Sequence, residues 1–573
     1  MFNFGPYSDM YSGMYHPARD GVMLLCGLLI AVAYFLNLAA LKEGSGRKYW
    51  ILIFLVPVLG FVCPDTIFFT LIALIAVNFY RRLVKGENVA KLQAAVSVAA
   101  LGLISLSKGT FVYTAAYFIM LLAVLSALKR RLRLMLAIIA GCALSMLVFW
   151  LLAGQDMANL PRFFYYIYLV GMNYTEAMTS FTNIYLELLF MLVAAFFTLT
   201  LLLEADMKPA DRLFGIFIYG PILFMLFKSG FVRDDLGHNI IAYSGLLVVS
   251  SFLPFVFKFR SFNILWFAGA MVLYAVANLI ALSVYMQVPI LPKTFSSLQG
   301  IAVRLSDPGR YKTEFDRALA SYRRDYALPG LQGTSDVYSW DITYLLSSPN
   351  SWNPRPVFVS FNVWHARLAE LNREHLLDPK KAPDNVFFAV QTLDMRYPTM
   401  DDGPSLPVLI NSYELNGEYG RHLIFRRGVA RGKSAREGRL LATSSRRFDE
   451  KVDVSSFERP LYVTFDIKRS FPGNIANFLF KTSPVFIKVD LRDGTSQVFR
   501  INPGVGKAGF LLSPLISNNA NLKAVIKSKD GPFPTKVESF TVFLVIDFMR
   551  GYTLSKFTGY LWNPTYTVSL YEL

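Results

Sequence analysis

The sequence predicts a polytopic α-helical membrane domain of about ten spanning helices, followed by an extracytoplasmic α/β region and a C-terminal β-sandwich of the jelly-roll kind. Three observations lead to this prediction. First, 54% of the 573 residues are hydrophobic and 17% are charged, whereas about 25% of the residues in soluble domains are charged. Second, long apolar runs dominate residues 21–291, and charged residues return at ordinary density over 292–573. Third, short runs after residue 446 alternate apolar and polar side chains, which is typical of strands.

The apolar half contains ten candidate membrane spans. A spanning helix needs about 20 consecutive apolar residues, and several of the candidates are shorter than this. The last is long enough to continue into an interfacial segment. The candidates are 21–41, 49–63, 66–80, 93–107, 110–128, 134–153, 181–203, 213–228, 239–257 and 262–291.

Basic residues in the loops predict the orientation. The loops on one side of these spans carry 15 lysines and arginines, and those on the other side carry 5. The positive-inside rule places the richer set in the cytoplasm, so the tail 1–20, the loops 154–180 and 228–238 and the entire C-terminal half lie outside. No signal peptide precedes this outer N-terminus. We therefore expect either that the short tail is translocated by itself or that a further N-terminal helix precedes it.

Composition also excludes some functions. The net charge of +17 does not indicate nucleic-acid binding, because much of it lies in short loops where it sets topology, and no basic face with interleaved aromatics is present. The three cysteines, Cys26, Cys63 and Cys142, lie in or beside apolar segments. They provide neither a zinc cluster nor disulfides for the C-terminal half. The sequence leaves the cofactor open, and a divalent metal is one candidate.

The outer loop 155–180 is too polar to span the membrane. It carries the aromatic cluster FFYYIY at 163–168, and such rings favour the headgroup level of a bilayer. We therefore expect an interfacial helix on the outer surface. It serves either as an aromatic belt or as a platform for a lipid-linked substrate.

The loop KSGFVRDDLGH at 228–238 is the densest polar cluster of the membrane half. Ionisable groups at membrane depth are costly and suggest function. Lys228 and Arg233 are candidates for binding a phosphate, and Asp234, Asp235 and His238 are candidate catalytic groups. Asp234 is the first choice as general base. The alternative is a self-neutralising loop cap at the interface.

Three other polar residues face the same side. Lys108, in the turn SKGT, either snorkels to the surface or meets an anionic headgroup together with the 228–238 loop. Asp65 and Glu176 are single carboxylates in outward loops, and we expect them to be loop residues rather than catalysts.

The C-terminal half contains two predicted modules. Residues 300–330 form an amphipathic helix, and 292–430 as a whole is an α/β domain with strand-like runs VFVSF, NVFFAV and HLIFRR. This domain carries DVYSWD at 336–341, NPRP at 353–356 and LDMRYPTMDDG at 393–403. The acidic residues of the last stretch, with Arg396, suggest a polar site or calcium loop, but their spacing is not that of an EF-hand. We interpret the stretch as a surface turn.

A basic linker is predicted over 431–445, followed by the β-sandwich over 446–573. The sandwich is predicted from six alternating runs and contains no cysteine, so we expect it to fold without a disulfide. Such modules often bind carbohydrate. The six runs are LYVTFDI, NFLFK, VFIKVDL, QVFRI, FTVFLVI and TVSLYEL.

This layout, a polytopic bundle with a soluble C-terminal domain across the membrane from the cytoplasm, resembles the GT-C class of membrane glycosyltransferases. The resemblance implies a polyprenyl-phosphate-linked sugar as donor and a catalytic carboxylate in the first outer loop. That loop corresponds to the tail 1–20, so Asp9 is the best match and Asp20 the second. The chain also resembles a group of uncharacterised bacterial membrane proteins, through GPYSDMY, WLLAGQ, FKSGFVRDDLGH, PRPVFVSF and LDMRYPTMDDG.

Two classes of function follow. The first is a glycosyltransferase in the bacterial plasma membrane that transfers a sugar from a polyprenyl-phosphate-linked donor to a cell-envelope glycan or lipid acceptor outside. The second is a non-enzymatic component of a glycan or lipid export or assembly system, with a carbohydrate-binding β domain. The spanning segments are almost free of charge. This favours chemistry at the outer rim over transport along a polar path.

Overall fold

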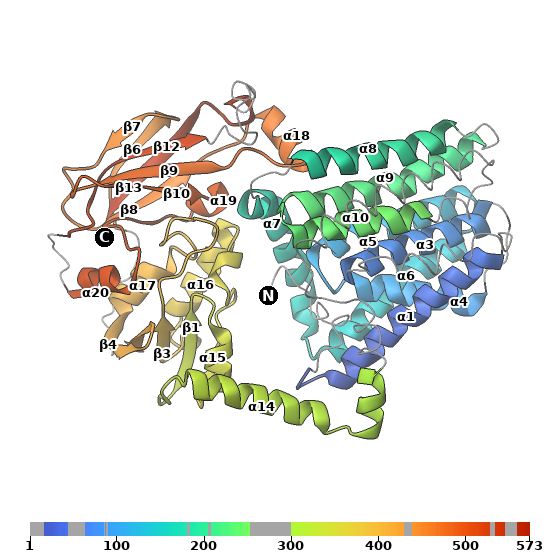
Figure 1. Ribbon diagram of the computed structural model, residues 1–573, viewed down its shortest axis with the longest axis horizontal. Coiled ribbons are helices and arrows are strands. Elements are labelled where there is room, and N and C mark those ends of the chain that lie inside the picture. The colour runs from blue at the N-terminus through green and yellow to red at the C-terminus, as the bar shows by residue number, and fades with distance from the viewer. Residues whose placement is uncertain are drawn as a thin grey trace. The chain divides into compact units, whose positions relative to one another are not determined.

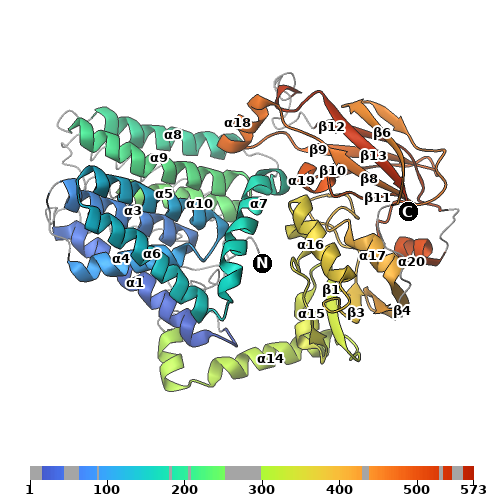
Figure 2. The same cartoon turned by 180° about the vertical axis from the view of Figure 1, so that it is seen from behind.

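The computed structural model describes residues 16–43, 64–84, 86, 90–179, 184–203, 208–251, 299–428, 438–527, 533–544 and 559–573. The chain divides into two compact units. The first, called here the helical unit, comprises residues 2–168 and 180–312, and the second, the sheet unit, comprises 169–179 and 313–573. Figures 1 and 2 show the two units from opposite sides.

The helical unit contains long helices that run side by side (Figure 1). Six of those in the described residues are long and apolar enough to cross a membrane: α1, α3, α5, α6, α8 and α9. These helices support the prediction of a multi-pass membrane protein, and the orientation of the spans stays a prediction. The helices are α1 (Asp20–Glu43), α3 (Pro64–Val84), α4 (Lys91–Ile104), α5 (Gly109–Leu128), α6 (Leu132–Leu152), α7 (Leu160–Met178), α8 (Ile184–Leu203), α9 (Pro209–Phe231) and α10 (Leu236–Ser251).

The other four predicted spans have different outcomes. The segment 93–107 corresponds to α4, whose 14 residues make a helix of about 21 Å, short of the roughly 30 Å hydrocarbon core. The segment 239–257 corresponds in part to α10, which has 16 residues. The segments 49–63 and 262–291 lie outside the described residues.

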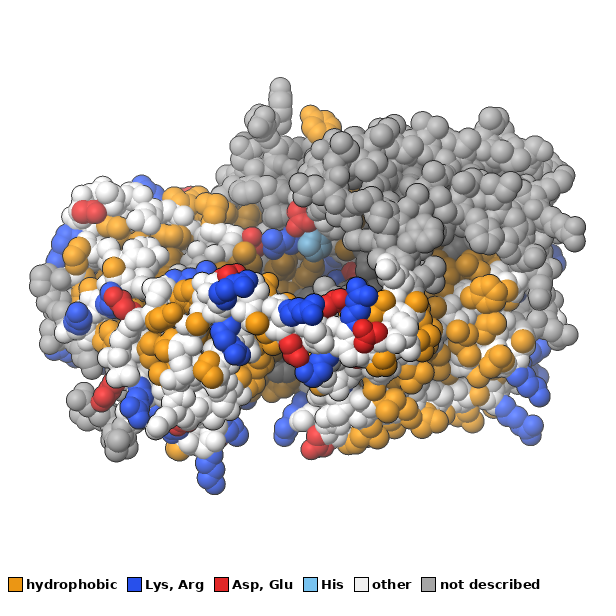
Figure 3. Space-filling model, turned by 60° about the horizontal axis from the view of Figure 1, so that its bottom comes forward, with side chains coloured by type: hydrophobic (Ala, Val, Ile, Leu, Met, Phe, Trp, Pro, Cys, Tyr) orange, Lys and Arg blue, Asp and Glu red, His pale blue; other side chains and the backbone are white. Residues whose placement is uncertain are grey.

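Buried amides join three of these helices. The side-chain nitrogen of Asn37 in α1 donates to Ser97 Oγ of α4 at 2.8 Å. The side-chain oxygen of Asn37 accepts from Asn78 of α3 at 3.0 Å and from Gln93 of α4 at 3.1 Å. Interhelical hydrogen bonds of this kind help to hold helices together in a bilayer, because the hydrophobic effect does not drive helix association in lipid. Figure 3 shows apolar side chains gathered over the helical unit, at the right of the view.

The α/β part of the sheet unit has one five-stranded sheet with the order β2-β1-β3-β5-β4. Strand β1 pairs in parallel with β2 and β3, and the remaining pairs are antiparallel. The mixed α/β prediction is confirmed. The elements are α14 (Arg310–Asp325), β1 (Thr334–Tyr338), α15 (Ile342–Ser347), β2 (Ser351–Trp352), η3 (Ser360–Asn362), α16 (Ala366–Leu377), β3 (Asn385–Phe388), α17 (Ser405–Ser412), β4 (Tyr413–Tyr419) and β5 (His422–Arg427).

Two four-stranded antiparallel sheets follow, with the orders β10-β9-β12-β7 and β11-β8-β13-β6. Buried side chains of both sheets, such as Phe465, Ile487 and Phe540, form one hydrophobic core. The elements are β6 (Arg439–Arg447), β7 (Lys451–Asp453), β8 (Leu461–Asp466), α18 (Phe471–Leu479), β9 (Val485–Leu491), β10 (Ser496–Ile501), α19 (Pro503–Gly506), β11 (Phe510–Ser513), α20 (Asn519–Lys527), β12 (Val537–Leu544), η4 (Gly559–Leu561) and β13 (Thr565–Glu572).

Several local predictions were wrong. The run NFLFK lies in the end of helix α18 and the residues after it, because Ser470 caps the helix by accepting from the backbone N–H of Gly473. The run VFVSF forms no strand and leads into η3. Strand β6 begins at Arg439, inside the range predicted as linker, and pairs along its length with β13. The remaining five runs of the predicted sandwich contribute β8, β9, β10, β12 and β13.

Candidate functional site

The predicted polar loop 228–238 is shorter in the structure than the sequence suggests. Helix α9 continues through Pro221 and ends only at Phe231, so Lys228 lies in its last turn rather than in a loop. Helix α10 begins at Leu236. The connection between the two helices is therefore four residues long and contains Arg233, Asp234 and Asp235.

Asp235 and His238 form a close pair at the start of α10. Oδ1 of Asp235 lies 2.7 Å from Nδ1 of His238 and also accepts the backbone N–H of His238 at 3.0 Å. Nε of Arg233 donates to the other oxygen, Oδ2, at 2.9 Å. Partial burial raises the pKa of Asp235, but the hydrogen bonds from His238 and Arg233 outweigh this effect and bring the pKa down to about 2.

This geometry assigns different chemistry to the two residues. A carboxylate with a pKa of about 2 is a weak proton acceptor at neutral pH. An imidazole whose Nδ1–H donates to a carboxylate has its lone pair on Nε2 and is held in one orientation. The pair therefore suits proton transfer at His238, with Asp235 as the orienting group. Asp234, the first choice from the sequence, accepts from the side-chain amide of Asn239 at 2.9 Å.

Lys108 forms a second ion pair at the ends of other helices. Its ammonium lies 2.7 Å from Oδ2 of Asp65, and the two side chains are 24% and 6% exposed. Lys108 directly precedes α5, and Asp65 lies in the first turn of α3. Asp65 was expected to be a simple loop residue, but it is a buried member of a helix-linking ion pair.

The two ion pairs lie at different levels of the neighbouring helices α3 and α10. Thr66 of α3 hydrogen-bonds Ser244 of α10 at 3.0 Å. Ser244 follows Asp235 by nine residues, which is about 13 Å of helix at 1.5 Å per residue. The structure thus brings Arg233, Asp235 and His238 together, and pairs Lys108 with Asp65 in a separate place. Asp9 lies outside the described residues.

The sheet unit holds a buried charge network that the sequence did not predict. It joins the three stretches DVYSWD, NPRP and LDMRYPTMDDG around Arg355, which is 1% exposed. Nη1 of Arg355 donates to Asp336 at 2.8 Å, and Nε lies 3.5 Å from Asp402. The guanidinium also lies 3.4 Å from the centre of the Tyr338 ring. The interpretation of 393–403 as a surface turn was wrong, because Arg396 and Asp402 are 1% and 2% exposed.

Asp402 is the most strongly perturbed carboxyl of this network. Burial raises its pKa to about 7, although Arg355 and hydrogen bonds from Asn372 and Ser405 act in the opposite direction. The Asn372 amide and the Ser405 hydroxyl donate to its two oxygens at 2.9 and 2.8 Å. The carboxyl therefore changes charge near neutral pH.

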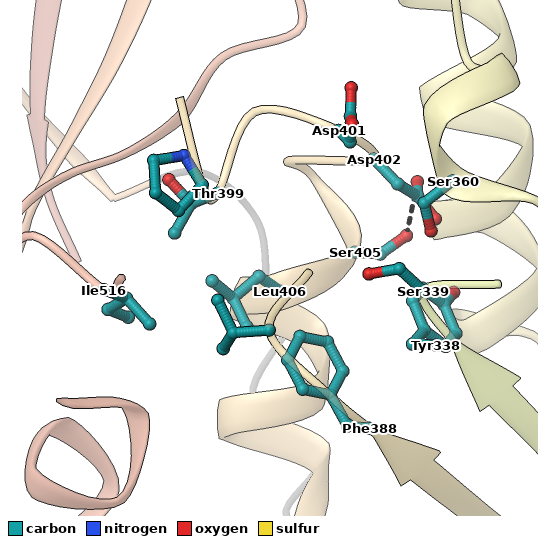
Figure 4. A pocket seen from close by; sticks show the side chains of 12 residues that line it. Tyr338, Ser339, Ser360, Phe388, Thr399, Asp401, Asp402, Ser405, Leu406 and Ile516 are labelled. Carbon is teal, nitrogen blue, oxygen red and sulfur yellow. Dashed lines mark hydrogen bonds between the residues drawn. The ribbon is translucent and has the colours of Figure 1, made fainter. Parts of the chain in front are cut away.

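A small cavity of about 20 Å³ lies beside this network (Figure 4). It is found at the carboxyl ends of β1 and β3, and the chain places β2 and β3 on opposite sides of β1. Ligands of parallel sheets bind at such points, where the strand order reverses. The lining residues are Tyr338, Ser339, Ser360, Phe388, Val390, Pro398, Thr399, Asp401, Asp402, Ser405, Leu406 and Ile516.

The pocket combines aromatic, hydroxyl and carboxyl groups. The rings of Tyr338 and Phe388 are stacked with centroids 5.9 Å apart. Asp401 pairs with Arg396 through one oxygen at 2.9 Å. Its buried Oδ2 has no hydrogen-bond partner within the described part of the chain. A polar atom buried in this way needs a water or a ligand group to satisfy it.

Three arginines bind the end of helix α7, within the sheet unit. Arg396 donates to the backbone carbonyl of Ala177 at 2.9 Å. Arg500 donates to the carbonyl of Glu176, and Arg469 forms an ion pair with the Glu176 side chain. Cations are favourable at a helix C-terminus because the last carbonyls have no partner within the helix. Glu176 was expected to be a loop residue, and it is instead a buried ion-pair partner.

The region predicted as an interfacial helix is indeed helical. Buried Phe163, Ile167 and Val170 follow one face of α7, and Tyr165 and Tyr168 are 52% and 53% exposed on another.

The described residues contain no group of three or more metal-ligating side chains. No protein-family model, curated protein or solved structure matches this chain.

Proposed function

We propose that this protein is a membrane glycosyltransferase that uses a polyprenyl-phosphate-linked sugar. The observation that carries the proposal is the Asp235–His238 pair, with Arg233 beside it, in a short connection of a unit with six candidate spans. A positioned imidazole is the commonest general base, and guanidinium groups bind phosphate oxygens well. Both groups are needed for transfer from a phosphate-linked donor.

In the proposed reaction, His238 takes the proton of an acceptor hydroxyl at Nε2. The acceptor oxygen forms a bond to the anomeric carbon of the donor sugar, and the bond from that carbon to the phosphate oxygen breaks. The polyprenyl phosphate leaves with the electron pair. Arg233 is the candidate cation for the phosphate, and it must exchange the carboxylate of Asp235 for it. Lys108 pairs with Asp65 at a different level of the helices and is not assigned to this phosphate.

The strand order of the sheet unit supports carbohydrate as the acceptor class. Numbered from one to eight along the chain, strands β6–β13 of the described residues have the orders 1-8-3-6 and 2-7-4-5. These orders match the eight-stranded jelly roll, an architecture used by lectin domains.

The test is turnover by the full chain in nanodiscs with polyprenyl-phosphate hexoses and pentoses as donors and extracted envelope glycan as acceptor. We expect His238→Gln to lower the rate by about 10²-fold or more. Asp235→Asn should lower it less and shift its pH profile, because Asp235 orients the imidazole. Asp325→Asn is the control, since this carboxylate is 67% exposed on α14.

A different result would favour the second class of function. The wild-type protein could bind glycan in a binding assay and turn over no donor. The protein would then be a non-enzymatic component of glycan or lipid export or assembly. Equal turnover by wild type, His238→Gln and Asp234→Asn would remove the catalytic assignment.

A further inference from the structure

Helix α18 has its apolar face on the outside. Phe471, Phe478 and Leu479 are 78%, 66% and 52% exposed, and Ile475 is 46% exposed. These positions follow the spacing i, i+4, i+7 and i+8, which places them on one face of a helix. Tyr560 of η4, which α18 contacts, is 70% exposed as well.

The opposite face of α18 is small and polar, and it is the buried one. Gly473 and Asn477 are both buried. A Cβ atom at Gly473 would lie 1.7 Å from the carbonyl oxygen of Leu561, so glycine is required for α18 to pack against η4. The N–H of Ser470 also donates to that carbonyl at 3.1 Å. Helices on the surface of soluble domains have the reverse arrangement, with the apolar face inward.

The contacts of α18 tie it to a residue that is close in sequence to a membrane span. Arg469, next to the capping residue Ser470, pairs with Glu176 in the last turns of α7. The sheet unit includes residues 169–179, which contain the second half of α7, and the apolar helix α8 begins at Ile184. The five residue steps from Thr179 to Ile184 span at most about 18 Å when fully extended. The start of α18 is therefore tied to a point only a short chain length from a candidate span.

We propose that the apolar face of α18, with Tyr560, inserts into the surface of the lipid bilayer. Interfacial helices bury one apolar face about 5–10 Å into the headgroup and acyl boundary, and exposed aromatic rings favour this level. The inverted burial of α18 supplies such a face, and the Arg469–Glu176 pair holds it near the chain's entry into α8. The sheet unit then has a second membrane contact besides the chain itself.

The test is electron paramagnetic resonance of the full chain in lipid nanodiscs, with single spin labels on a background without native cysteines. The labelled variants are Ile475→Cys and Leu479→Cys on the apolar face. Leu440→Cys on β6 is the matched control, because Leu440 is an apolar residue with 56% exposure. The reagents are molecular oxygen, which concentrates in lipid, and a water-soluble nickel chelate.

We expect the labels at 475 and 479 to be several-fold more accessible to oxygen than to the nickel chelate, and the label at 440 to show the reverse. Equal nickel accessibility at all three sites would overturn the proposal. Low accessibility of 475 and 479 to both reagents would also overturn it, because a second copy or another protein would then cover the face.

A second measurement does not depend on labelling. Full-length protein in vesicles that contain a phospholipid with a photoactivatable acyl chain should crosslink at 471–479. In the variant Phe471→Ser/Phe478→Ser, the yield of this crosslink should fall by at least about five-fold, while the melting temperature stays near that of the wild type. An unchanged crosslink yield in this folded variant would contradict the proposal.

Discussion

Arg355 offers a sharp test of the buried charge network. The variant Arg355→Met keeps the approximate length of the side chain and removes its charge. In the wild type, the guanidinium pairs with Asp336 and Asp402 and donates to the carbonyls of Val337 and Ser339. The side chains of Arg355 and of both carboxylate partners are at most 1% exposed. The variant therefore leaves buried acceptors and at least one buried charge without a partner.

Removing one partner of a buried ion pair lowers the free energy of unfolding by about 3–5 kcal/mol. For a unit of this size, each kcal/mol lowers the melting temperature by about 2–4 °C, so we expect a decrease of about 10 °C. The assay is thermal unfolding of the full chain in detergent, with proteolysis of the sheet unit as readout. Arg324→Met is the control, because Arg324 is 79% exposed and surface pairs contribute at most about 1 kcal/mol. A melting temperature of Arg355→Met within about 1 °C of the wild type would refute the reasoning.

Three further predictions follow from the structure and the sequence. Burial raises the pKa of Asp402 to about 7, above the value in the unfolded chain, so the folded state binds more protons. The contribution of Asp402 to stability is therefore lost as pH rises from about 4 to 7. Asp402→Asn should therefore gain stability relative to wild type as pH rises from about 4 to 7 in urea titrations, and a constant difference would contradict the assignment. Gly473→Val should destabilise the sheet unit by at least about 1 kcal/mol, because of the close approach to Leu561. Ile475→Val, on the exposed face, should not, and equal melting curves of the two variants would argue against this packing. A phosphatase fused to Leu573 should be active and a fluorescent protein dark, since the loop charges place this end outside; the reverse result would invert the topology.

The spans were predictable from the sequence because composition alone specifies them. A run of about 20 apolar residues has few alternatives to a membrane helix, and α1, α5, α6 and α8 lie close to their predicted ranges. The short α4 shows the limit of this reasoning, because the 14 residues of that helix are as apolar as a span but too short to be one.

The charge network was not predictable for a different reason. A charged residue in a turn is usually exposed, so Arg396 and Asp402 suggested a surface turn. Their burial depends on partners that are distant in sequence: Asp402 lies near Arg355, and Arg396 reaches Ala177. A single sequence does not contain these pairings. The same holds for Lys108 and Asp65, which are 43 residues apart.

Helix α18 was missed because its pattern is ambiguous. The run NFLFK has the residue types of a strand, and α18 exposes the apolar face that a helix of a soluble domain would bury. The helical signal lay just upstream, in Ser470 followed by Pro472 and Gly473, a capping residue before a helix start.

The hold of the sheet unit on α7 has a consequence for synthesis. Glu176 is made 293 residues before Arg469. At about 5–20 residues per second, this interval lasts about 15–60 s. During that time Glu176 at the end of α7 has been synthesised, but Arg469, which binds its carboxylate, has not. Over this interval the exposed Tyr165 and Tyr168 give α7 a surface that suits a membrane interface.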